Sequence, residues 1–163
     1  LKNTIKPEDP GTLISDVSNG KGIKAIAAKD GITAIKIKSG RMLLAYGFLR
    51  KVFEVFERFK TPIDMITTSE VAVSVTIDDT TYLSEIVEEL KYYGAVEVGS
   101  EQTIICVVGE NLIEQKGIIN EVFEALKHFN LRMISYGGSR HSISILVSAS
   151  DRKEALNSLN GIF

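Results

Sequence analysis

Two stretches in the first half of the chain repeat their apolar residues every three or four positions, which is the spacing of an amphipathic helix. The first spans about 47–60, and Pro62, which cannot sit inside a helix, marks its end. The second, near 83–90, sets apolar residues against acidic ones on its other side. The pattern therefore predicts two helices that each bury one face.

Alternating apolar and polar residues predict strands around these helices. The clearest alternation covers 71–77, where valines and isoleucine alternate with alanine, serine and threonine. The other strands predicted in this half are 33–37, 63–67 and 95–98. The order of elements is therefore βαββαβ.

The second half of the chain repeats the first at an offset of about 70 residues. GFLRKVFEVFERF, which begins at Gly47, matches GIINEVFEALKHF, which begins at Gly117, in its Gly, its Val-Phe-Glu and its last Phe. Common ancestry explains this match, and chance agreement of two amphipathic helices is the alternative. The elements predicted in this half are strand 103–108, helix 117–129, strands 131–136 and 142–147, and helix 151–159.

The second unit lacks the closing strand that the first unit has. An apolar stretch at 24–29 precedes the first unit and has no other assignment. Because proteins rarely leave a sheet edge unpaired beside a core, we expect 24–29 to supply the missing strand. In the alternative, 24–29 merely extends the strand at 33–37. The first interpretation predicts an α+β protein of two βαββαβ modules, with the first inserted in the second.

The composition is that of an ordinary globular chain, with 44% hydrophobic and 25% charged residues and a net charge of −2. The lack of a basic block argues against a nucleic-acid partner, and no apolar run reaches the ~20 residues of a membrane-spanning helix. The single cysteine, Cys106, cannot form an internal disulfide, so we expect a cytoplasmic protein with a buried, inert thiol. The first residue is Leu1, which suggests a piece of a longer polypeptide.

The sequence offers little support for catalysis or for a metal site. His128 and His141 have no companion ligands at useful spacing, and neither phosphate-binding glycine motif occurs. Aromatic residues lie mainly in the helix stripes rather than on strands, which argues against an RNA-binding βαββαβ module. The residues alone therefore predict a non-catalytic module.

One group of residues could bind a small ligand. The helix that begins at Gly47 should present the unpaired amides of Phe48 and Leu49, which attract a carboxylate. Asp64, Ser69 and Glu70 follow within one short stretch and could bind amines. A free amino acid carries both kinds of group. The alternative is an ordinary helix start beside a solvated turn.

Several strings of the chain resemble the regulatory region of the aspartate kinases, most of all the lysine-sensitive, monofunctional type. They are DMITTSEVAVSVTID at 64–78, KNTIKPEDPGTLI at 2–14, GFLxxVF from Gly47 and RMISYG from Arg132. The resemblance covers nearly the whole chain. It implies two ferredoxin-like ACT modules, with module 1 at 32–99 binding the effector and module 2 at 23–31 plus 100–163 serving the interface. Residues 1–22 would be the end of the kinase domain and a linker.

The resemblance also implies the chemistry of the parent polypeptide. That enzyme phosphorylates the side-chain carboxylate of aspartate with ATP, and its kinase domain would hold ATP and Mg²⁺. The fragment is then a sensor without catalytic residues, metal or cofactor of its own. We expect L-lysine or a related amino acid as effector and a homodimer formed through the ACT modules.

By position, the resemblance assigns nine residues to the effector pocket. The helix-end amides would bind the α-carboxylate, Asp64 the α-ammonium, and Ser69 with Glu70 the ε-ammonium. The nine are Met42, Gly47, Phe48, Leu49, Ile63, Asp64, Thr68, Ser69 and Glu70.

Two positions bear on which effector the chain binds and on the number of sites. Ala45 stands where such relatives tend to have serine, which removes a hydroxyl from the pocket. Arg140 occupies the place in the second unit that Glu70 has in the first, and its charge would repel an ammonium. We therefore expect one lysine site per chain. The alternatives are a pair of modules that senses threonine or another amino acid, and a dimerisation module that binds no ligand.

Overall fold

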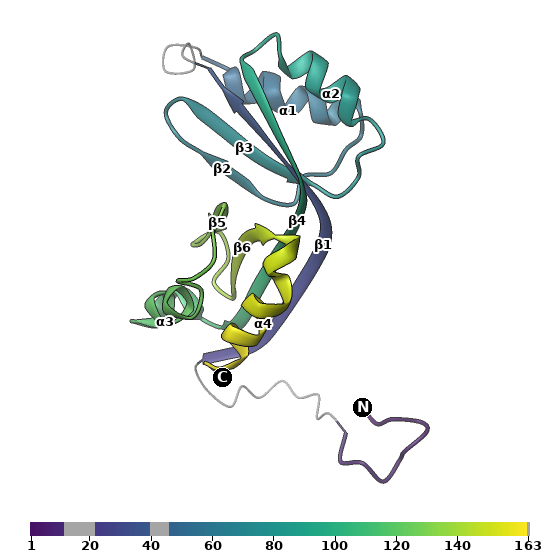
Figure 1. Cartoon of the computed structure of the whole chain (residues 1–163), viewed down its shortest axis with the longest axis vertical. Coiled ribbons are helices and arrows are strands. Elements are labelled where there is room, and N and C mark those ends of the chain that lie inside the picture. Colours follow the sequence, from purple (N-terminus) through teal and green to yellow (C-terminus); the bar gives the residue numbers. More distant parts are fainter. Residues whose placement is uncertain (12–21, 40–45, 163) are drawn as a thin grey trace.

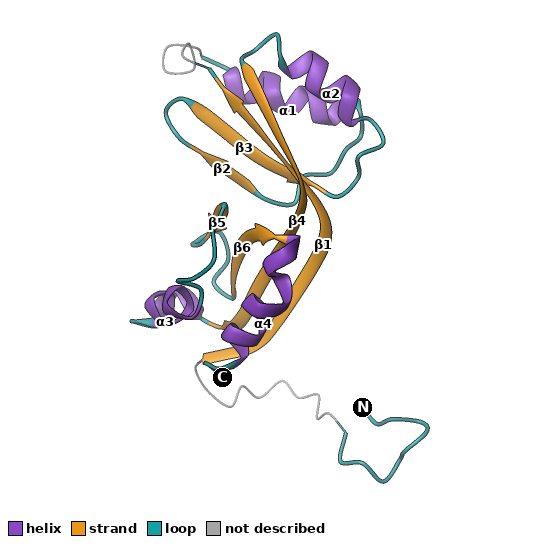
Figure 2. Ribbon diagram, viewed as in Figure 1, coloured by secondary structure: helices purple, strands orange, loops and turns teal. Residues whose placement is uncertain are grey.

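A computed structural model describes residues 1–11, 22–39 and 46–162 (Figure 1). One six-stranded antiparallel sheet runs through the body of the molecule, and helices cover it at both ends (Figure 2). Residues 1–11 form an irregular segment that lies apart from the sheet. The elements in chain order are β1 (Gly22–Lys38), α1 (Phe48–Arg58), β2 (Ile66–Thr68), β3 (Ala72–Ile77), α2 (Leu83–Leu90), β4 (Ala95–Glu110), η2 (Leu112–Glu114), α3 (Ile118–Ala125), β5 (Met133–Ser135), β6 (Ser142–Ser148), η3 (Ala149–Asp151) and α4 (Arg152–Asn160).

The strand order in the sheet is β2-β3-β1-β4-β6-β5, and the two central strands belong to both modules. The second part of β1 lies between β3 and the first part of β4, with Ile35 opposite Val75 and Val98. The first part of β1 pairs with the second part of β4, where Ala27 lies opposite Cys106. The missing strand of the second unit is thus the start of β1, and the predicted α+β fold with one module inserted in the other is confirmed.

The structure corrects one part of the prediction. The stretches 24–29 and 33–37 form one continuous strand, as do 95–98 and 103–108. The segment 24–29 therefore both extends the first unit's strand and completes the second unit's sheet. Register shifts between Lys29 and Ala34 let the long strands bend where one module passes into the other.

Each module has its own core on the side of the sheet that its helices cover. The first core joins β1 and β3 to α1 and α2 through residues such as Ile35, Val75 and Phe56, which are all fully or almost fully buried. The second joins β4 and β6 to α3 and α4 through Ile105 and Ile145. This arrangement follows from the helical and alternating patterns of the sequence, which the structure confirms in outline.

A third, smaller cluster joins the sheet faces that the helices leave uncovered. It brings Met65, just before β2, near Met133 at the start of β5, with residues of β1, β4 and β6 around them. The uncovered faces of the two modules therefore turn toward each other at the junction. The cluster consists of Ile32, Ala34, Met65, Ile104, Met133 and Leu146.

The edge strands and the helices α1 and α3 are shorter than the sequence predicted. The strand predicted at 63–67 is Ile66–Thr68, and that at 131–136 is Met133–Ser135. Each pairs with one neighbour only. The helix predicted at 117–129 ends at Ala125, because Leu126 leaves the helical region.

Candidate functional site

Helix α1 begins without a side-chain cap. Gly47 adopts the left-handed region at φ 79°, which glycine tolerates readily, and no acidic residue lies in the first turn. Buried Phe48 anchors the first turn in the core, whereas Leu49 stays partly exposed. No carboxylate of α1 itself therefore accepts hydrogen bonds from the first backbone N–H groups of the helix. The carboxylate of a ligand could accept them instead.

The turn between β2 and β3 lies at the same end of the module as the start of α1. The amide of Ser69 donates to the carbonyl of Ala72 over 2.8 Å, and that of Ser39, which follows β1, donates to Val71 over 2.9 Å. Thr68 lies opposite Val73, which shares the first core with Phe48. The fold thus places Thr68, Ser69 and Glu70 on the side from which α1 begins (Figure 1).

Asp64 does not join this group within one chain, so the expectation of a single cluster of Asp64, Ser69 and Glu70 is wrong. Its amide donates to Thr76 over 2.9 Å, at the opposite end of the β2–β3 hairpin. Its carboxylate accepts from Lys29 over 2.6 Å, and Lys29 also pairs with Asp78 at 2.7 Å.

The Lys29 ammonium bridges two carboxylates at this end of the hairpin. Hydrogen bonds to Asp64 and then Asp78 raise the pKa of Lys29, and the bond from Lys29 lowers the pKa of Asp78. This contact could not be predicted from the sequence, because Lys29 belongs to the part of β1 assigned to the other module.

The remaining candidate residues divide between the two ends of the module. Ile63 lies beside Asp64 and packs partly against the first core. Glu70 is exposed at the β2–β3 turn, and the described residues supply it with no ion pair. Met42 and Ala45 lie outside the described residues.

The second module repeats the helix start but has a different charge at its turn. Gly117 precedes α3 as Gly47 precedes α1. Arg140 stands at the corresponding turn and pairs with Glu114. A cation therefore lies where the first module presents the Glu70 carboxylate.

Comparison with solved structures decides the family. A chain from Porphyromonas gingivalis W83, assigned as a C-terminal regulatory domain of aspartate kinase, is 47% identical and superposes with a TM-score of 0.77. The match covers 85% of this chain and 95% of that one. The chain belongs to the family of aspartate kinase regulatory domains.

Other aspartate kinases match over nearly the whole chain. Escherichia coli aspartokinase III, solved in complex with lysine and aspartate in its T-state, is 32% identical with a TM-score of 0.81, covering 96% of this chain and 38% of that one. Aspartokinase 3, chloroplastic, of Arabidopsis thaliana is 33% identical over 100% of this chain. The chain spans about a third of the length of the curated relatives it matches, 31% in the Arabidopsis protein.

The match to a domain family falls on the second module. Residues 105–163 match the ACT domain family, which fits an aspartate kinase regulatory domain with ACT modules. In the part of the chain that the structure describes, no helix is long and apolar enough to cross a membrane. The same residues include no group of three or more side chains suited to hold a metal ion.

Proposed function

We propose that this aspartate kinase regulatory domain is a lysine sensor whose effector site lies in the first module. The observation that carries the proposal is the uncapped start of α1 beside the turn that bears Ser69 and Glu70. Lysine carries one carboxylate and two ammonium groups. An amide-rich helix start and exposed acidic groups match those charges.

A second copy of the chain would complete the site. Strand β2 is an edge of the sheet and pairs only with β3, so its other side is available for a strand of a partner. If two β2 strands pair antiparallel about a two-fold axis between Ile66 and Thr67, Asp64 lies opposite Ser69 of the partner subunit. The homodimer thereby brings together the two ends that one chain holds apart.

Each residue then has a defined task. The amides of Phe48 and Leu49, freed by the turn at Gly47, donate to the α-carboxylate. Asp64 accepts a hydrogen bond from the α-ammonium, while Asp78 retains its ion pair with Lys29. Ser69 and Glu70 accept hydrogen bonds from the ε-ammonium, and Ile63 and Thr68 enclose the aliphatic chain.

The regulatory effect follows from differential binding. Lysine shifts the parent enzyme toward an inhibited form only if it binds that arrangement more tightly than the active one. We expect ~1–3 kcal/mol of coupling to the distant kinase site, the usual range for allosteric pairs. The parent would be a cytoplasmic enzyme that transfers a phosphoryl group from ATP to the aspartate side chain, with ATP and Mg²⁺ held by its kinase domain.

The second module takes no lysine in this proposal and serves the interface. Arg140 replaces the acidic group at the turn and is itself paired with Glu114. The turn therefore presents a guanidinium, and no free carboxylate, to a ligand ammonium.

Isothermal titration of the intact chain with lysine, threonine and other amino acids tests the proposal. Lysine should give saturable heat with one site per chain. Heat from another amino acid alone would indicate a sensor for that compound. No binding heat with any of the amino acids would indicate a dimerisation module.

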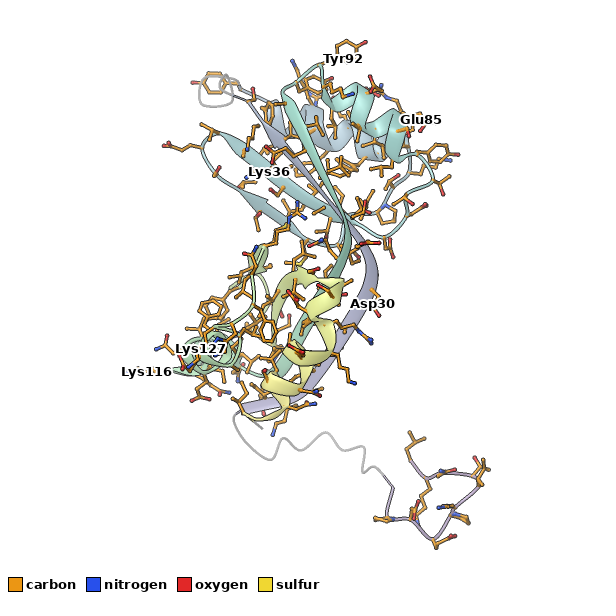
Figure 3. The ribbon with its side chains drawn as sticks, in the orientation of Figure 1. Asp30, Lys36, Glu85, Tyr92, Lys116 and Lys127 are labelled. Atoms are coloured by element: carbon orange, nitrogen blue, oxygen red, sulfur yellow. The ribbon has the colours of Figure 1, made fainter. Side chains whose placement is uncertain are left out.

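Replacing Glu70 tests the role of the ε-ammonium partner. Glu70→Gln should weaken lysine binding about tenfold, since a charge-assisted hydrogen bond of ~1.5–3 kcal/mol becomes a neutral one. Glu85→Gln changes an exposed glutamate of α2 and should leave the affinity unchanged (Figure 3). Equal affinities for Glu70→Gln and the unaltered chain would show that Glu70 does not contact the ligand.

A further inference from the structure

A polar cavity lies on the face of the first module's sheet that α1 and α2 leave uncovered. Its volume is about 450 Å³, and β1, β2, β3 and the segment before β5 all contribute to its wall. Lys36 lies in the middle of this sheet (Figure 3). The residues that carry the argument are Lys36, Lys38, Thr67, Ser74 and Arg132.

Strand alternation sets this cavity on the face opposite α1, and Thr68 and Ser69, which the proposed lysine site also uses, line its edge. Lys36 lies between Ile35 and Ile37, which are both fully buried against the helices, so its side chain points to the uncovered face. In register beside it stand Ser74 of β3 and Glu97 of β4, and Thr67 of β2 stands beside Ser74. One polar row therefore crosses four strands on the face opposite α1.

The fifth residue comes from the other module. Arg132 precedes β5, and its backbone amide donates to Leu146 over 2.9 Å, which ties it to the second module's sheet. Its guanidinium lies over Gly99 of β4, since a Cβ built at Gly99 would come within 2.1 Å of Nη1. The absence of a side chain at Gly99 thus leaves room for this cation above the sheet.

The charges around the cavity do not balance. Lys38 pairs with Glu97 over 2.5 Å, but among the described residues neither Lys36 nor Arg132 makes an ion pair. The bond from Lys38 lowers the pKa of the Glu97 carboxyl, and the charges of Lys36 and Arg132 add to that effect. Three cations and one carboxylate leave an excess of two positive charges around this surface cavity, which attracts anions.

We propose that this cavity binds a small dianion, either a phosphate group or a dicarboxylate. Lys36 and Arg132 donate charge-assisted hydrogen bonds to it, and the hydroxyls of Thr67 and Ser74 donate neutral ones. Because Lys36 belongs to the first module and Arg132 to the second, the anion joins the two modules and favours one arrangement of them. Lysine, a cation with two ammonium groups, is excluded by the same charges.

Titration of the intact chain with inorganic phosphate and with succinate, against sodium chloride at equal ionic strength, tests this proposal. At least one of the two anions should give saturable heat. The anion that binds more tightly identifies the chemical class that the cavity takes. Lys36→Gln and Arg132→Gln should each weaken that binding at least tenfold. Lys116→Gln removes an exposed lysine at the far end of the second module and should leave it unchanged (Figure 3).

Two further measurements complete the test. Lysine binding should not weaken in any of these variants, because each removes a positive charge or none, so failure of the anion site and failure of the lysine site are distinguishable. If a charge variant does not fold, Gly99→Ala displaces the guanidinium without removing a charge and should weaken anion binding in the same way. Heat no greater than that of chloride, or an equal loss in Lys36→Gln, Arg132→Gln and Lys116→Gln, would overturn the proposal.

Discussion

Two glycines of β4 make close approaches of different kinds. A Cβ at Gly109 would lie 2.3 Å from the carbonyl oxygen of Gly22, which is backbone of the neighbouring strand. A Cβ at Gly99 would meet only the end of the Arg132 side chain, which can rotate away. The same substitution therefore has different consequences at the two positions.

We expect Gly109→Ala to lower the free energy of unfolding by about 1–3 kcal/mol, because the two strands must separate to admit the methyl group. Gly99→Ala should cost less than about 1 kcal/mol, in the range of surface substitutions, while it disturbs the anion site. Urea denaturation of both variants measures the difference. Equal destabilisation would show that Arg132 is held in place as firmly as backbone.

The candidate site shows which residues could be placed from the sequence. Ser69 and Glu70 were predictable at a turn, because the alternating strand that follows them fixes a hairpin. The partner of Asp64 was not predictable. Lys29 lies 35 residues earlier in the chain and reaches Asp64 only because β1 is continuous across both modules.

The two long strands each carry one residue in the left-handed region where the modules meet. Gly31 of β1 has φ 72°, and Glu101 of β4, 70 residues later, has φ 55°. No atom lies within 4 Å of a Cβ built at Gly31, so only the backbone conformation disfavours a side chain there. The equivalent positions of the repeat thus use different residues for the same bend.

Exchanging the residue types at these positions should change stability in opposite directions. Gly31→Ala should cost about 1–2 kcal/mol, the strain of a left-handed alanine. Glu101→Gly should gain up to about 1 kcal/mol, since strain relief exceeds the added chain entropy of glycine. Guanidinium denaturation of the single variants measures both. A lower free energy of unfolding in both variants would mean that the Glu101 side chain makes a contact whose stabilising effect exceeds the cost of its backbone strain.

Periodicity predicted the helices and most strands, yet it could not predict that β1 and β4 are continuous. At 30–32 and 99–102 the alternation breaks, which in a sequence resembles a turn. In the structure these breaks are bulges, because paired shifts in both strands keep the ladder intact. Whether a break ends a strand depends on the partner strand.

At the scale of the whole molecule, one sheet serves two modules and has two edges, β2 and β5. The edges approach each other near Met65 and Met133, where the uncovered faces meet. Beyond this contact, β2 pairs on one side only and carries Ile66, an apolar side chain that is 45% exposed. An exposed apolar edge strand invites pairing with a second chain.

Changing this edge therefore tests the homodimer and the lysine site together. Ile66→Lys should convert the dimer to a monomer, because a lysine on an edge strand opposes strand pairing. Lysine binding should weaken at least tenfold with it, since Asp64 of one subunit no longer approaches Ser69 of the other. Ile5→Lys places the same charge at an exposed isoleucine of the irregular segment 1–11, away from the sheet, and should change neither property. Sedimentation velocity and lysine titration of both variants measure the outcome. A monomeric Ile66→Lys that binds lysine normally would show that each chain holds a complete site, and the position of Asp64 beside Lys29 would then exclude it from that site.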